Sequence, residues 1–190
     1  HHHEMPRAIA NPPNPWSRER TEWASDSIDT PPPLTKLEVF EETAKSILSE
    51  NQSPDLSFRW SANPYRGCYH GCAYCYARPT HQYWGLGAGT DFDRKIIVKT
   101  NAAALLHEAF AAKGWKGEWL VLSGNTDCYQ PLEASYRITR SMLETCVVFR
   151  QPVGIITKSS LIRRDLDLLA KLGREGRVKV TLSIAFEDDE

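Results

Sequence analysis

The sequence lacks long apolar runs and lacks a strong excess of charge of either sign. No apolar stretch approaches the ~18 residues that a membrane-spanning helix needs, so we expect neither a membrane span nor a membrane partner. Lys and Arg total 23 against 24 Asp and Glu, which gives a formal net charge of −1. This balance excludes the broad basic surface of a dedicated nucleic-acid binder but leaves room for a local basic patch.

We expect no secretory leader, and the cysteines do not fit an exported disulfide protein. No charged segment followed by an apolar one opens the chain. The five cysteines are odd in number and three of them are clustered, whereas a disulfide scaffold usually has an even, dispersed set. We therefore expect a reducing, cytoplasmic location.

Glycine is absent before Gly67, and proline is concentrated in the same part of the 190-residue chain. After His1–His3, which resemble a tag remnant, residues 5–34 are expected to form an extended arm with polyproline II geometry at the proline runs. A short helix is expected over Thr35–Glu50, where Thr35 and Glu38 fit a capping box and four apolar residues recur at helical spacing: Leu37, Phe40, Ala44 and Ile47. We assign the arm and this helix to residues 1–57, and the main domain to residues 58–190.

The main domain alternates between apolar strands and amphipathic helices. Strands are expected near 58–61 and at 95–99, 119–122, 153–157 and 178–184, and helices at 101–113, 132–150 and 161–172. Asn101 is the expected N-cap of the first of these helices. Such alternation indicates βαβ units and a parallel sheet, in which the loops after the carboxyl ends of the strands carry the chemistry. Two polar segments occupy such positions, residues 123–127 and 158–159.

Cys68, Cys72 and Cys75 are spaced C-x3-C-x2-C in one loop. Thiolates select iron–sulfur clusters and zinc, and three of them can bind three irons of a [4Fe–4S] cluster while the fourth iron keeps an open position. The alternative is a non-catalytic module in which one zinc ion takes these thiolates and either His70 or His81. Of the other cysteines, Cys146 is expected within a helix, as a small residue of the protein core.

The segment NPYRGCYHGCAYCYARPTH and the later TDCYQPLE resemble the radical S-adenosylmethionine (radical SAM) enzymes, and within them the spore photoproduct lyase-like (SplB-type) branch. The resemblance covers about residues 51–190. It implies that the three cysteines bind a [4Fe–4S] cluster and that S-adenosylmethionine binds the fourth iron. One electron from the reduced cluster then cleaves S-adenosylmethionine into methionine and a 5′-deoxyadenosyl radical, which starts the chemistry on the substrate.

The resemblance also implies the residues that bind S-adenosylmethionine. Tyr74 matches an aromatic residue near the adenine, and Asn125, Thr126 and Asp127 match the loop that meets the amino group. Lys158 matches a contact to the carboxylate or ribose. Ser183, on the last strand, is a further candidate for contact with the ribose or the carboxylate. Three residues continue the cysteine loop: Tyr76, Arg78 and His81. We expect them to pack beneath the cluster rather than to contact substrate.

The fold that the resemblance implies is an α/β barrel of six βα units. The chain has strands for about four, so we expect a partial (β/α)6 barrel, preceded by the arm, in a truncated chain that associates through its open strand edge. An external electron donor and an unidentified substrate are implied, with nucleic acid among the candidates. Three arginines and three aromatic residues near the loop prompt that candidate: Arg59, Arg66, Arg78, Trp60, Tyr65 and Tyr69.

Overall fold

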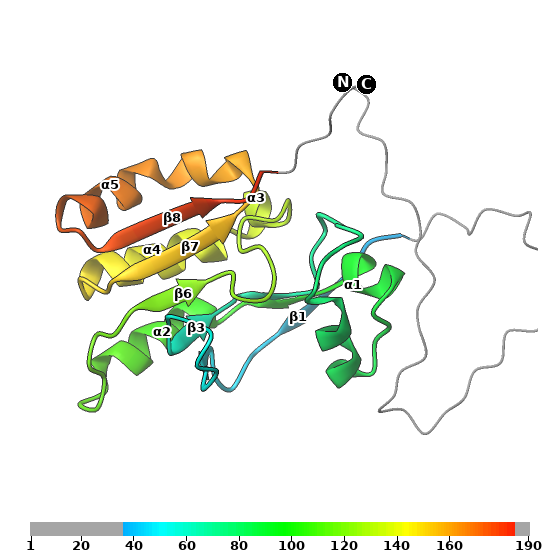
Figure 1. The fold of residues 1–190 in the computed structure, drawn as a ribbon, viewed down its shortest axis with the longest axis horizontal. Coiled ribbons are helices and arrows are strands. Elements are labelled where there is room, and N and C mark those ends of the chain that lie inside the picture. Colours follow the sequence, from blue (N-terminus) through cyan, green and yellow to red (C-terminus); the bar gives the residue numbers. More distant parts are fainter. Residues whose placement is uncertain (1–35, 185–190) are drawn as a thin grey trace, which may run out of the picture.

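The computed structural model of this chain describes residues 36–184, and the expected arm at 5–34 lies outside them, as does Thr35 of the expected capping box. The described residues form an α/β fold with two sheets (Figure 1). The larger sheet has the order β2-β3-β6-β7-β8. Its strands are β2 (Leu48–Glu50), β3 (Trp60–Ala62), β6 (Leu120–Leu122), β7 (Val153–Thr157) and β8 (Val178–Leu182).

Four neighbouring strands of this sheet, β3, β6, β7 and β8, run parallel, and only β2 is antiparallel to its neighbour. The expectation of a partial barrel with about four parallel core strands is confirmed. In β6 and β7 the Val, Ile and Leu residues favour strands because such side chains pack well on a pleated sheet. At one edge of the sheet, β8 pairs on only one side within the described residues.

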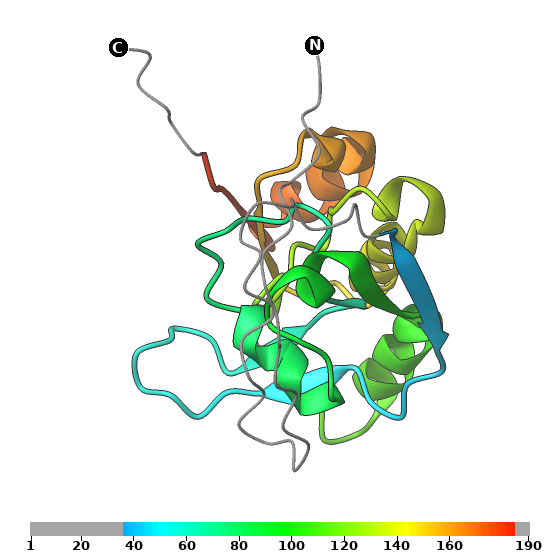
Figure 2. The ribbon, with the colours of Figure 1, turned by 90° about the vertical axis from the view of Figure 1, so that its right-hand side faces the viewer.

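Three helices cover one face of the larger sheet: α2 (Ala102–Ala111), α4 (Ile138–Val148) and α5 (Leu166–Arg174). Figure 2 shows them following one another down one side of the molecule. Alternate strand residues point into this layer and form one core with the helices, which includes Leu120, Leu122, Val153, Ile155, Leu106, Met142, Leu143 and Leu169. Cys146 of α4 lies in the same core, fully buried, as expected.

The opposite face of the sheet is less covered. It borders a hollow of about 410 Å³, lined among others by Phe58, Trp119, Ile156 and Lys179. No helix in residues 36–184 has the length and apolar character that crossing a membrane requires.

The helix expected over Thr35–Glu50 is wrong, because its described part forms strands. β1 (Glu38–Glu42) pairs in parallel with β5 (Lys95–Lys99), and β4 (Tyr65–Arg66) pairs on the other side of β5 to complete the smaller sheet. β1 is mostly exposed, so its apolar residues do not form the buried stripe that a helix would need. Pairing with the buried β5 decides its conformation.

Two of the other expected helices are interrupted. The helix expected over 132–150 is divided into α3 (Glu133–Tyr136) and α4 by Arg137, whose φ of 54° is left-handed. The segment expected as a helix over 161–172 begins with a 3₁₀ helix, η2 (Ser160–Asp165), before α5. Asn101 precedes α2 as expected, but its side chain does not cap that helix and instead exchanges two 2.9 Å hydrogen bonds with the backbone of Ala44.

Candidate functional site

The cysteine loop, residues 67–77, leaves β4 and lies beyond the carboxyl ends of β6 and β7. It is folded by tight turns in which Gly71 N donates to Cys68 O at 3.1 Å and Cys75 N donates to Cys72 O at 3.2 Å. Gly67 begins the loop with φ +76°, and a Cβ there would lie 2.7 Å from the carbonyl oxygen of Phe92. Glycine is therefore required at this position by both conformation and space.

The three thiols of the loop differ in environment. Cys68 is buried, whereas Cys72 and Cys75 are half-buried. Burial raises the pKa of Cys68 to about 12, although backbone N–H groups of Asp127 and His70 hydrogen-bond the sulfur and act in the opposite direction. Such N–H groups stabilise a thiolate once a metal has displaced the proton.

In the metal-free chain we expect alkylation to follow this difference in exposure. Iodoacetamide should modify Cys72 and Cys75 first, and the buried thiols of Cys68, Cys128 and Cys146 only on unfolding. Mass spectrometry of peptides from a time course measures the order. Modification of Cys128 or Cys146 at the rate of Cys72 would contradict the structure.

Lys158, which follows β7, reaches across to the cysteine loop. Its Nζ lies 2.8 Å from Cys72 Sγ and 3.0 Å from Tyr74 Oη, and 5.2 Å from the centre of the Tyr74 ring. The contacts with Cys72 and Tyr74 raise the pKa of Lys158, so its ammonium is charged at neutral pH. The structure thus brings together two of the residues predicted to bind S-adenosylmethionine and one predicted ligand of the cluster.

Asp127, which lies beyond the end of β6, ties this loop to the end of β7. Its carboxylate accepts hydrogen bonds from Tyr129 N at 2.9 Å, Thr157 Oγ1 at 2.7 Å and Lys158 N at 3.0 Å, and His70 Nε2 lies 3.3 Å away. Burial acts to raise the pKa of Asp127, but the adjacent His70 ring and hydrogen bonds from Lys158 N and Thr157 outweigh it and hold the pKa below its usual value. Asp127 is therefore a charged carboxylate whose oxygens are already engaged.

The other predicted cofactor residues are spread along the same edge. Thr126 is buried and its hydroxyl donates to Tyr65 O at 3.0 Å, so it fixes the backbone. Asn125 is exposed and donates to Thr80 Oγ1 at 3.2 Å. Ser183 is exposed just after β8, where its N–H donates to Thr157 O at 2.9 Å.

Arg78 and His81 pack beneath the loop. Both belong to the 3₁₀ helix η1 (Arg78–Trp84) and are buried beside α1 (Thr90–Arg94). Arg78 donates to Cys72 O at 3.0 Å and Gly71 O at 3.1 Å, and pairs with Asp93 at 3.1 Å. His81 Nε2 lies 3.0 Å from Lys95 O. The phenol of Tyr76 is different, since it is exposed and donates to Gly124 O at 2.7 Å.

This geometry does not favour the single-zinc alternative. His81 is directed to the backbone of β5, and His70 is beside Asp127. In the part of the chain that the structure describes, no three His, Cys, Asp or Glu side chains converge as the ligands of one ion would. Thiolates that bind three different irons of one cluster need not converge on a single point.

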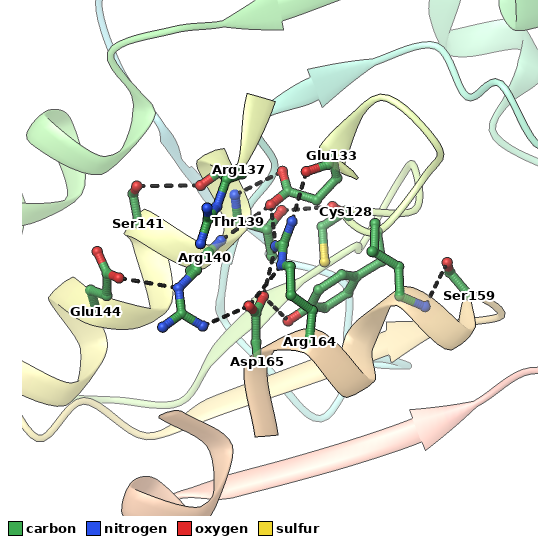
Figure 3. A network of polar contacts seen from close by, with 12 residues as sticks. Cys128, Glu133, Arg137, Thr139, Arg140, Ser141, Glu144, Ser159, Arg164 and Asp165 are labelled. Atoms are coloured by element: carbon green, nitrogen blue, oxygen red, sulfur yellow. Dashed lines mark hydrogen bonds and ion pairs between the residues drawn. The ribbon is translucent and has the colours of Figure 1, made fainter. Parts of the chain in front are cut away.

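Sequence reasoning missed a buried polar network around Glu133, Arg164 and Asp165 (Figure 3). Glu133 and Asp165 have fully buried side chains, and both accept from Arg164, at 2.7 and 2.8 Å. Tyr65 donates its hydroxyl to Glu133, and Tyr129 donates to Asp165 at 3.0 Å. The only sequence signal was the density of polar residues in TDCYQPLE, which also contains Gln130.

Comparison with known proteins identifies the domain. Residues 62–189 match the family model described as the radical SAM superfamily. The chain belongs to the radical SAM superfamily. Members typically use a [4Fe–4S] cluster and S-adenosylmethionine, and the superfamily implies an enzyme with S-adenosylmethionine-dependent radical chemistry.

Three relatives from different organisms are similar to this chain. An uncharacterized protein of Mycobacterium tuberculosis is 40% identical over 162 residues, which are 84% of this chain and 47% of the relative. An uncharacterized protein of Methanocaldococcus jannaschii is 31% identical over 72% of this chain and 49% of its own length, and one of Acidianus two-tailed virus is 28% identical over 70% and 45%. The chain spans about half the length of these relatives. No solved structure matches it.

The residues of this radical SAM domain fit a [4Fe–4S] cluster. The donor set is three thiols on one loop, two of them half-exposed at its surface. Backbone N–H groups lie at the sulfur of Cys68, and the ammonium of Lys158 lies at the sulfur of Cys72. Both arrangements stabilise negative charge on sulfur, as thiolate ligands require.

Proposed function

We propose that this domain reductively cleaves S-adenosylmethionine at a [4Fe–4S] cluster held by Cys68, Cys72 and Cys75. When bound, the cluster supplies the electron that generates a 5′-deoxyadenosyl radical. The observation that carries the proposal is the contact of Lys158 with Cys72 and Tyr74, which joins the cysteine loop to the carboxyl end of the sheet. In parallel α/β folds this edge is where ligands bind.

The chain's own residues suit the two ends of the amino-acid group of S-adenosylmethionine. Lys158 supplies a cation for the carboxylate, and the charged Asp127 favours an ammonium nearby. Because the oxygens of Asp127 already accept several hydrogen bonds, we propose that the ammonium donates mainly to Asn125 and to nearby backbone carbonyls. Tyr74, with 74% of its surface exposed, is free to contact the adenine, and Ser183 is the proposed ribose contact.

We further propose that the domain belongs to the spore photoproduct lyase-like branch. Supporting this are the two sequence segments that resemble it, together with the structural use of their residues. Gln130 and Glu133 of TDCYQPLE are fully buried; Gln130 contacts Tyr69 of the cysteine loop, and Glu133 contacts Tyr65, two residues before the loop. The proposal also includes an external electron donor and an unidentified substrate, with nucleic acid as one candidate. We propose in addition that the chain self-associates through the edge of β8.

The test is anaerobic reconstitution of the 190-residue chain with iron and sulfide, followed by dithionite and S-adenosylmethionine. The Mycobacterium tuberculosis relative, which is about twice as long, is assayed in parallel. We expect a brown protein with iron and sulfide in cluster stoichiometry, and 5′-deoxyadenosine that depends on dithionite. A chain that binds stoichiometric zinc instead, with no 5′-deoxyadenosine from either protein, would contradict the proposal.

A further inference from the structure

Gln130 contacts the backbone of the cysteine loop beside its first cysteine and is fully buried. Its side-chain Oε1 accepts a hydrogen bond from Tyr69 N at 2.8 Å, and its Nε2 donates to Gly67 O at 3.1 Å. These two peptide groups belong to the residues on either side of Cys68. One amide side chain therefore holds the backbone both before and after the buried thiol.

Gln130 is itself held in place on both sides. Its N–H donates to Asp127 O at 3.2 Å, and its carbonyl accepts from Glu133 N at 2.9 Å. The adjacent residue, Tyr129, is buried and bonded to Asp165. The position of the amide is thus fixed by the same turn that carries Asp127 and by the buried network below it.

We propose that Gln130 is a positioning residue for the first thiolate ligand, and that it sets the conformation of the loop around Cys68 before a cluster binds. This inference rests on the proposed function. A primary amide offers one acceptor and one donor side by side, which match the N–H of Tyr69 and the C=O of Gly67. Holding the loop in advance removes part of the ordering cost of cluster binding.

The chain offers a matched control in Gln151, which is also buried and also uses both amide atoms. Its Oε1 accepts from Trp115 Nε1 at 2.8 Å, and its Nε2 donates to Glu118 O at 2.6 Å and Pro152 O at 2.9 Å. Gln151 precedes β7, so it lies at the opposite end of the strand from Lys158. Methionine at either position keeps a similar side-chain length and removes both hydrogen-bonding groups.

The experiment compares the full chain with Gln130→Met and Gln151→Met. Denaturant unfolding should show that both variants fold and lose comparable stability, because each leaves buried backbone groups unpaired. Only Gln130→Met should weaken iron binding, by about 10- to 100-fold, as loss of a supporting group around a metal site does. Its residual cluster should also show an altered electron paramagnetic resonance spectrum and reduction potential.

Results that contradict the role of Gln130 differ from results that contradict the proposed function. Equal loss of iron in both variants, or unchanged iron binding and spectrum in Gln130→Met, would show that Gln130 has only a structural role. Absence of a cluster in the unsubstituted chain would instead count against the proposed function. Hydrogen exchange of the metal-free, unsubstituted chain gives a test that needs no substitution. The N–H of Tyr69 should exchange more slowly than the N–H of Ala73. Rapid exchange of the Tyr69 N–H would show that Gln130 does not hold the backbone at this position.

Discussion

Cys72→Ser should reduce the iron and sulfide content of the reconstituted chain to background and abolish the formation of 5′-deoxyadenosine. The hydroxyl of serine is a hard, weakly acidic ligand that replaces a soft thiolate, so one iron of the cluster would lose its protein ligand. Cys72 is chosen because its thiol is half-buried at the surface of the loop and its sulfur contacts Lys158 at 2.8 Å. The substitution changes one atom and leaves the loop turns in place.

Cys146→Ala is the matched control for this loss. Cys146 is a thiol of the same chain, but it is fully buried in α4 among core side chains. Its removal should cost about 1 kcal/mol of stability and leave iron, sulfide and product at the level of the unsubstituted chain. If Cys72→Ser bound as much iron as Cys146→Ala, the cysteine loop would not hold the cluster.

The parts of the fold that follow from local pattern were predictable from the sequence. The strand expected at 153–157 is β7, and that expected at 95–99 is β5, because continuous apolar runs specify buried strands without reference to distant partners. The segment Glu38–Glu42 was not predictable in this way. Its conformation depends on parallel pairing with Lys95–Lys99, more than 50 residues along the chain.

The break at Arg137 shows how a buried side chain overrides local helix signals. Glu133 Oε2 accepts from Thr139 N at 3.0 Å, and Oε1 accepts from Arg140 N at 3.3 Å, so its carboxylate caps the first turn of α4. A continuous helix would leave this carboxylate without those donors. The residue that directs the break is charged in the sequence but buried in the fold, and local propensity gives no indication of that burial.

The candidate site divides in the same manner. The three cysteines were proposed as ligands from their spacing, and Lys158 was proposed from its place after a strand together with the resemblance; the structure brings Lys158 to Cys72, while the cofactor roles of all four stay predictions. The roles of Gln130, Arg78 and Glu133 were not predictable, because each acts on backbone or side chains that are distant in sequence or become buried only on folding. Asp127 was proposed from its matching position in the resemblance, but its hydrogen bonds to Thr157 and Lys158 required the structure.

Arg164→Met should destabilise the chain by about 3–5 kcal/mol, because it removes the cation shared by two buried carboxylates. Arg164 donates to Glu133 at 2.7 Å and to Asp165 at 2.8 Å, and the side chains of both acids are fully buried (Figure 3). Methionine keeps much of the packing of the side chain. The free energy of unfolding in denaturant measures the loss, and Arg150→Met is the control, since the Arg150–Glu175 pair is exposed and should contribute little.

The dependence of this loss on pH separates charge from packing. Burial acts to raise the pKa of Asp165, but hydrogen bonds from Arg164 and Arg140 outweigh it and hold the pKa below its ordinary value. A lowered pKa in the folded state adds stability above the unfolded value of about 3.9, and this is lost as the pH falls through the folded value. The difference in the free energy of unfolding between the unsubstituted chain and Arg164→Met should therefore be largest near neutral pH and should become smaller below about pH 4. If the difference is the same at neutral pH and below about pH 4, the loss of stability comes from packing. A loss of stability no larger than that of Arg150→Met would show that the buried network does not stabilise the fold.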